Sequence, residues 1–331
     1  MFLHGGKIIG SGGSGCITSN QDSTFVNKIL QQEEYNYELE ISTVLSRIDP
    51  QLLYCIYSPV EARNCNIDYI DEDIQKYRNN LVRRKELATC FRLQMELDNH
   101  QSVLCSMKVP KFDFDLNEMH SSEVFLKEQG YTETMFLNQI LLLWKGLNLL
   151  HTRDLVHCDI KLQNIAFRKS IKQSNQSHFA FFDWGWSLYL PNDSVENQRK
   201  IRAQIQDMSQ FKYYQYRNDS FGPWSYLLIT KLGPKLCKAK PSTILFHQMK
   251  ALLEYNDVYS LVNVTMHLIA GLAGHTELPK QDILNYCKSI LDDDENEMAF
   301  KVYTIEAVSK RLEELFFQNN SRLHKSPMRF L

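Results

Sequence analysis

A glycine-rich run near the N-terminus is the first group of residues whose types and spacing suit chemistry. It reads Gly10-Ser11-Gly12-Gly13-Ser14-Gly15, a G-x-G-x-x-G pattern with one extra glycine. Because glycine has no side chain, the backbone N–H groups of such a run can approach a phosphate closely. Alone the pattern is weak, since a Rossmann turn or a plain flexible hairpin has the same composition. A phosphate site at Gly10, Gly12, Gly13 and Gly15 therefore depends on support from other residues.

A lysine and two glutamates follow this run at a spacing that suits the same ligand. Lys28 closes a short apolar strand, where it can bind the α- and β-phosphates of a nucleotide if a glutamate from a nearby helix orients it. Glu38 and Glu40 are both candidates. We favour Glu38 because Ile41 and Leu45, at i+3 and i+7, place it on the packed helix face. Taken alone, Lys28 would be interpreted as a surface lysine of an edge strand.

Two polar segments further along the chain resemble the catalytic motifs of eukaryotic-type protein kinases. They are His157-Cys158-Asp159-Ile160-Lys161-Leu162-Gln163-Asn164 and Phe182-Asp183-Trp184-Gly185. The first is similar to the catalytic loop of that family, and the second is similar to its metal-binding D-F-G. Both follow the glycine-rich run and Lys28 in the order that the family requires. A coincidence of all four features is much less expected than a chance match to one motif.

The resemblance implies a role for each residue in transferring the γ-phosphate of ATP. Asp159 would meet the acceptor hydroxyl, and Lys161 would steady the transferring phosphate. Asn164 and Asp183 would hold Mg²⁺, for which two protein ligands suffice because substrate oxygens and waters supply the rest. In the family, lysine at position 161 goes with serine/threonine specificity. Asp257 would support the backbone of the catalytic loop.

The chain departs from the family pattern at three places. Cys158 replaces the arginine that pairs with a phosphorylated activation-loop residue, which predicts activity independent of such phosphorylation. Trp184 replaces phenylalanine, and its bulk is expected to change how freely Asp183 moves. Gly222-Pro223-Trp224 stands where an A-P-E motif is expected, without the glutamate. Substrate docking is therefore the least supported part of the resemblance.

The elements that must position these residues suggest an α+β fold. It would be bilobal and protein-kinase-like, with a small strand-rich N-lobe over residues 1–110 and a larger helical C-lobe over residues 111–331. The tract at 64–84 is interpreted as an insertion of unknown role. Short apolar runs bounded by Gly, Asn and Asp predict strands, and the i, i+3, i+4 spacing of apolar residues predicts helices. Strands are expected at 7–9, 24–26, 90–95 and 102–105, and helices at 31–48, 132–151, 241–255, 257–271, 280–291 and 303–319, with an irregular stretch at 191–222.

Composition narrows the class of protein further. The formal net charge of −2 gives no basic field for nucleic acid, and no apolar stretch is long enough for a membrane span. The N-terminus lacks the features of a signal peptide. Eight scattered cysteines without a C-x-x-C pair are interpreted as reduced thiols of an intracellular, cytoplasmic protein. The chain, including Ile48-Asp49-Pro50 and Phe221-Gly222-Pro223-Trp224-Ser225, resembles divergent kinases of large DNA viruses. That resemblance would place the protein in the host cytoplasm or a virion.

The sequence therefore predicts a serine/threonine protein kinase that uses ATP and Mg²⁺ and acts on protein hydroxyls. Two alternatives stay open: a pseudokinase-type nucleotide-binding scaffold, and a small-molecule kinase of the same fold. The complete set of Lys28, Asp159, Asn164 and Asp183 argues against the scaffold, and Lys161 argues against the small-molecule kinase. A Rossmann oxidoreductase would leave the segments around Asp159 and Asp183 unexplained.

Overall fold

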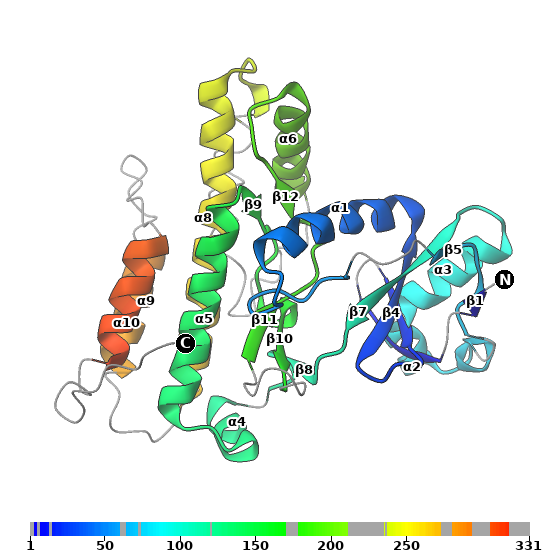
Figure 1. Ribbon diagram of the computed structural model, residues 1–331, viewed down its shortest axis with the longest axis horizontal. Helices are drawn as coiled ribbons and strands as arrows, with labels where there is room; N and C mark the ends of the chain where they lie inside the picture. Colours follow the sequence, from blue (N-terminus) through cyan, green and yellow to red (C-terminus); the bar gives the residue numbers. More distant parts are fainter. Residues whose placement is uncertain are drawn as a thin grey trace. The chain divides into compact units, whose positions relative to one another are not determined.

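Five strands form one antiparallel sheet in the N-terminal part of the chain, in the spatial order β2-β3-β4-β7-β5 (Figure 1). The computed structural model of the protein describes residues 3–4, 7–12, 15–59, 64–71, 74–119, 121–169, 178–210, 235, 237–272, 280–292 and 305–317. A separate parallel pair joins β1 and β6. The bounds are β1 Leu3–His4, β2 Ile8–Ser11, β3 Cys16–Ser19, β4 Phe25–Gln31, β5 Asn64–Cys65, β6 Ile67–Tyr69 and β7 Leu104–Pro110.

Helix α1 (Gln32–Ile48) follows β4 directly and confirms the helix predicted there. Its first turn carries Glu33 and Glu34, which interact favourably with the positive end of the helix dipole. Tyr35 packs with residues of β4 and β7 in one buried apolar cluster. The helix therefore packs against the sheet along one face, and that face includes the buried Glu38.

The segment between β6 and β7 contains a 3-10 turn, η1 (Ile74–Tyr77), and two helices, α2 (Leu81–Glu86) and α3 (Ala88–Asp98). The strand predicted at residues 90–95 was therefore wrong. Cys90, Leu93 and Gln94 are the buried residues of α3, and their i, i+3, i+4 spacing is helical. The apolar residues of this short run were compatible with either element, and packing against the sheet selects the helix.

Short strands and two helices begin the second part of the chain. Strands β8 (Phe114–Asp115), β10 (Ile165–Arg168) and β11 (His178–Phe181) form one sheet, and β9 (Leu155–Val156) pairs with β12 (Leu188–Tyr189). Helix α4 covers Ser122–Gln129 and α5 covers Glu133–His151. Thr132 caps α5 by accepting a hydrogen bond from the Met135 N–H, as the predicted helix start requires. A one-turn 3-10 helix, η2 (Leu162–Asn164), lies in the loop before β10.

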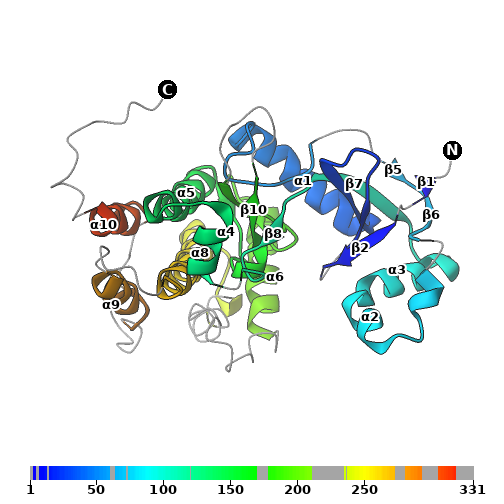
Figure 2. The same ribbon diagram turned by 90° about the horizontal axis from the view of Figure 1, so that it is seen from below.

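Four further helices complete the description: α6 (Val195–Gln210), α8 (Thr243–Ala270), α9 (Lys280–Asp292) and α10 (Ile305–Phe317). Figures 1 and 2 show α5 and α8 running side by side, with α9 and α10 next to them. Two predictions need correction. Residues 195–210 are helical where an irregular stretch was expected, and the two helices expected at 241–255 and 257–271 are one helix. Asn256 and Asp257, which suggested a break, are buried within α8.

The chain divides into two compact units. The first contains Met1–Asp113, Arg168–Asn175 and Phe182–Gly185, and the second contains Phe114–Phe167, Gln176–Phe181 and Trp186–Leu331. The first is rich in antiparallel strands and the second is mainly helical, so the predicted α+β fold class is confirmed. Within the described ranges, no helix has the length and apolar character that a membrane crossing demands.

Four cysteines form two disulfides within the first unit, Cys16–Cys90 and Cys65–Cys105. The interpretation of all eight cysteines as reduced thiols was therefore wrong. The partners are 74 and 40 residues apart in the sequence, and only the packing of α3 and the pairing of β5 with β7 bring them together. Because disulfides are rare in reducing compartments, the cysteines no longer support a cytoplasmic location. Free thiols are found at Cys55, Cys158, Cys237 and Cys287.

Candidate active site

The described residues of the glycine-rich run, Gly10 to Gly12 and Gly15, lie at the end of β2 and just before β3, and are called the glycine-rich turn. Ser11 is paired with Cys16, and the Gly12 N–H donates to the Gly15 carbonyl oxygen at 2.8 Å. A Cβ atom on Gly15 would lie 2.9 Å from Leu30 Cδ2 and 3.1 Å from the Ile29 carbonyl oxygen, so a larger residue there would force these neighbours to shift. A Cβ on Gly10 would meet no atom within 4 Å. Gly13 and Ser14 lie outside the described residues.

Lys28 lies on β4 between its neighbours β3 and β7, within hydrogen-bond distance of two carboxylates. Its Nζ atom is 2.6 Å from Glu38 Oε1 and 3.3 Å from Asp183 Oδ1, and all three residues belong to the first unit. The geometry thus selects Glu38 from the two candidate glutamates, while Glu40 is exposed. Burial lowers the pKa of Lys28, but Glu38 and Asp183 outweigh it and raise the pKa above its ordinary value. The ammonium therefore stays charged.

Trp184 fixes the backbone next to Asp183. Its indole Nε1–H donates to the Ile56 carbonyl oxygen at 2.7 Å, and the side chain is buried. Asp183 itself has a φ of 63°, in the left-handed region that non-glycine residues adopt only when the surroundings hold them there. The indole hydrogen bond is a contact that phenylalanine could not make. The tryptophan therefore restrains Asp183, whereas the sequence suggested only an effect of its bulk.

In the second unit, Asp159 is held by the two residues that follow it in the motif. Lys161 Nζ lies 2.7 Å from Asp159 Oδ2. Asn164 donates from Nδ2 to the Asp159 carbonyl oxygen at 2.9 Å and to Oδ2 at 2.8 Å. Both of these bonds use the amide nitrogen, which leaves the Asn164 amide oxygen as the acceptor that would face a cation. The structure brings these three predicted residues together.

Asp257 of α8 supports the backbone just before Asp159. Its carboxylate accepts from the N–H groups of His157 at 2.7 Å and Cys158 at 2.8 Å, and lies 3.1 Å from His151 Nε2. The Asp257 side chain is fully buried. Buried N–H groups are costly without acceptors, so this carboxylate fixes the start of the loop. Cys158 has a φ of 64° and depends on the same contact.

The Cys158 thiol is buried at the position where the resemblance given by the sequence called for an arginine. Burial first, and then the nearby carboxylates of Asp257 and Asp159, raise the pKa of this thiol well above its ordinary value. The side chain therefore stays neutral and cannot bind a phosphorylated residue as a cation would. Gly222-Pro223-Trp224, where an A-P-E motif was expected, lies outside the described residues.

The donor chemistry of Asp183 and Asn164 fits Mg²⁺, which prefers carboxylate and amide oxygens and keeps several positions for substrate. Among the described residues, no group of three or more His, Cys, Asp or Glu side chains gathers as a self-sufficient metal site. Asp183 belongs to the first unit and Asn164 to the second. Each of these residues supplies too few oxygens to hold Mg²⁺ by itself, so the ion would need phosphate oxygens and waters to complete its coordination.

Sequence reasoning missed three contributors to this region. The Ile56 carbonyl oxygen that accepts from Trp184 is a backbone atom, and no sequence pattern marks it. Thr89 and Cys90 contact the glycine-rich turn from α3, and these contacts depend on a helix where the sequence predicted a strand at residues 90–95. The even number of cysteines was the one signal in the sequence for disulfides, and it does not show which cysteines are bonded to each other.

Comparison with known proteins adds little to this description. No family model matches the chain, and no curated protein matches it. Among solved structures, the BubR1 kinase domain is similar to it with a TM-score of 0.46 and 12% sequence identity, over 93% of this chain and 78% of that one. A likeness at this level says nothing about individual residues or activity.

Proposed function

We propose that the chain is an ATP-dependent protein kinase that phosphorylates serine or threonine hydroxyls. The observation that carries the proposal is the pair of polar groups described above. Lys28 is held between Glu38 and Asp183 in one unit, and Asp159 is held by Lys161 and Asn164 in the other. Phosphoryl transfer depends mainly on positioning and on charge neutralisation, and these two groups offer both.

Each residue would act on a defined atom of the reactants. Lys28 would bind the α- and β-phosphate oxygens, and the backbone N–H groups of the β2–β3 turn would lie over the phosphates. Asp159 would accept the proton of the acceptor hydroxyl as its oxygen attacks the γ-phosphorus and the bond to the β-phosphate oxygen breaks, releasing ADP. Lys161 would turn from Asp159 to the transferred phosphoryl group. Mg²⁺, when bound by Asp183 and Asn164, would neutralise phosphate charge.

Specificity and location are parts of the proposal that rest on the sequence. Lys161 favours a serine or threonine protein acceptor over a small metabolite. The neutral Cys158 favours activity that needs no phosphorylation of the activation loop. We retain an intracellular site of action, in host cytoplasm or a virion if the chain is viral. Two disulfides make a strongly reducing cytosol the less favourable of these settings.

The test is transfer of label from γ-labelled ATP with Mg²⁺ to generic protein acceptors, for wild type and for Asp159→Asn. We expect phosphoserine or phosphothreonine from wild type and a rate at least about 10³-fold lower in the variant, because the catalytic base is lost. Asp154→Asn is the matched control, since Asp154 lies in the same unit and its carboxylate pairs with Lys250. Tight nucleotide binding without transfer by wild type would favour the scaffold, and label only on a metabolite would favour the small-molecule kinase.

A further inference from the structure

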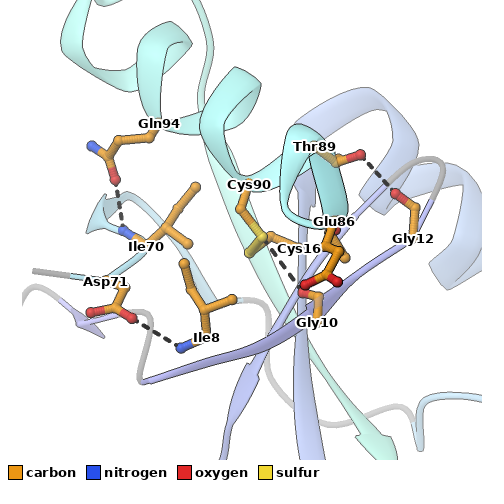
Figure 3. The surroundings of a disulfide bond; sticks show 11 residues. Ile8, Gly10, Gly12, Cys16, Ile70, Asp71, Glu86, Thr89, Cys90 and Gln94 are labelled. Carbon is orange, nitrogen blue, oxygen red and sulfur yellow. Dashed lines mark hydrogen bonds between the residues drawn. A yellow bond between two sulfur atoms is a disulfide. The ribbon is translucent and has the colours of Figure 1, made fainter. Parts of the chain in front are cut away.

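The glycine-rich turn is covered on one side by the β6–α3 segment, defined here as residues 67–71 and 74–98. Figure 3 shows how closely the two approach. Asp71 Oδ2 accepts from the Ile8 N–H at 3.2 Å at the start of β2. The Ser11 hydroxyl donates to the Glu86 carbonyl oxygen, and Thr89 Oγ1 donates to the Gly12 carbonyl oxygen at 2.7 Å. The segment thus contacts both β2 and the turn itself.

The Cys16–Cys90 disulfide lies at the centre of these contacts. Cys16 is the first residue of β3, directly after Gly15, and Cys90 lies on α3. Both cysteines are fully buried in an apolar cluster that joins the sheet to the segment. Cys90 Sγ also lies 3.5 Å from the Gly10 carbonyl oxygen. In the disulfide that sulfur has no hydrogen, so this is a packing contact, whereas a reduced thiol could donate there.

The bonds from the β6–α3 segment to the described part of the turn use no backbone N–H group of the turn. The bonds from Thr89 and Ser11 use the Gly12 carbonyl oxygen and a side-chain hydroxyl. Neither bond uses a backbone N–H of the glycine-rich run, and N–H groups are what a phosphate requires. The segment therefore restrains the turn without occupying its donors. Restraint of a flexible glycine-rich loop in its binding conformation raises affinity because less entropy is lost when the ligand binds.

We propose that the β6–α3 segment is a redox-dependent clamp that positions the glycine-rich turn for nucleotide phosphates. The inference rests on the proposed function, since it assigns regulation to the same site. A dithiol reductant would attack the Cys16–Cys90 bond, and two electrons and two protons would convert it into two thiols while the reductant becomes a disulfide. The covalent tie between turn and segment would then be lost, and the affinity for MgATP would fall.

The second disulfide provides an internal control. Cys65–Cys105 joins β5 and β7, two strands that are already paired in the sheet at those same residues. Its loss removes a covalent bond of the same type from the same unit. It does not join the glycine-rich turn to anything, so the clamp predicts that its loss leaves nucleotide affinity unchanged.

The experiment uses the whole chain with the substitutions Cys65→Ala and Cys105→Ala, which remove the second disulfide. Dithiothreitol can then reduce the Cys16–Cys90 disulfide without also opening Cys65–Cys105. Because both sulfurs are buried, thiol titration first confirms that the bond has opened. MgATP affinity is then measured by calorimetry, and amide hydrogen exchange is measured over residues 8–19. We expect reduction to weaken MgATP binding about tenfold and to speed exchange in the turn. Unchanged affinity and unchanged exchange after confirmed reduction would overturn the clamp.

Two further comparisons separate the clamp from general stability and from the proposed function. Cys90→Ala should reproduce the weaker binding without reductant, while Cys65→Ala should bind as wild type does; equal effects of the two would contradict the clamp. Thr89→Val, which removes only the hydroxyl bond to Gly12, should weaken binding about twofold. If the oxidised protein binds no nucleotide, the proposed function fails, and the exchange measurement alone decides whether the segment restrains the turn.

Discussion

Asp159 and Lys28, the two central residues of the candidate site, are supported in different ways. Asp159 follows a backbone fixed by Asp257, a fully buried carboxylate on the long helix α8. Lys28 is held by side-chain ion pairs on a small sheet, and a disulfide links the residue after the glycine-rich turn to helix α3. The difference suggests that the loop around Asp159 is held rigidly in its unit. The region around Lys28 depends instead on a few separate restraints, which are its two ion pairs, the Trp184 hydrogen bond and the Cys16–Cys90 disulfide.

The largest expected effect comes from Asp257→Ala. The substitution leaves the N–H groups of His157 and Cys158 buried without their acceptor, so we expect the free energy of unfolding to fall by about 3 kcal/mol or more. Denaturant titration measures this loss. Asp154→Asn, in the same unit, should change it by less than about 1 kcal/mol because its ion pair is partly exposed. Equal stability of the Asp257→Ala protein and wild type would contradict a rigidly supported loop.

Glu38→Gln should have the next largest effect, and Glu40→Gln on the same helix is its matched control. Removing one partner of a buried ion pair leaves Lys28 with Asp183 alone, and we expect a cost of about 2 kcal/mol in stability and about tenfold in MgATP affinity. Glu40 is exposed, so its amide variant should match wild type in both measurements. If the two variants behave alike in calorimetry, Glu38 does not orient the lysine.

Trp184→Phe should have a smaller effect on stability, and a matching substitution in the second unit shows whether its effect on MgATP binding is specific. It removes the indole donor and leaves the buried Ile56 carbonyl oxygen without that partner. We expect the free energy of unfolding to fall by about 1–2 kcal/mol. Trp144→Phe is the control, because Trp144 Nε1 donates to Thr265 in the core of the second unit. We expect similar losses in thermal stability from both. Only Trp184→Phe should weaken MgATP binding, by a few-fold, and a matching loss in Trp144→Phe would argue against a specific role for Trp184.

The sequence predicted the surroundings of Asp159 more successfully than those of the glycine-rich turn, although in the second unit it missed α6 and divided α8 into two helices. Long helices such as α5 were found because their apolar spacing and caps are local signals. The contacts around Asp159 lie within six residues of one another, so the motif itself implies them. In the first unit, α3 was misassigned as a strand and the disulfide between Cys16 and Cys90 was missed. The helical state of α3 and the disulfide both depend on packing between residues far apart in the sequence, and the pattern of neighbouring residues does not reveal such packing.

The most direct test of the account is to measure MgATP affinity and phosphoryl transfer side by side for Lys28→Met and Asp159→Asn. The account predicts that Lys28→Met lowers affinity by about tenfold or more, because its ammonium binds the phosphates. It predicts that Asp159→Asn leaves affinity within about twofold of wild type while transfer is lost, because Asp159 acts on the acceptor hydroxyl. Full transfer by Asp159→Asn, or unchanged affinity in Lys28→Met, would contradict the assignment of the two residues to separate tasks.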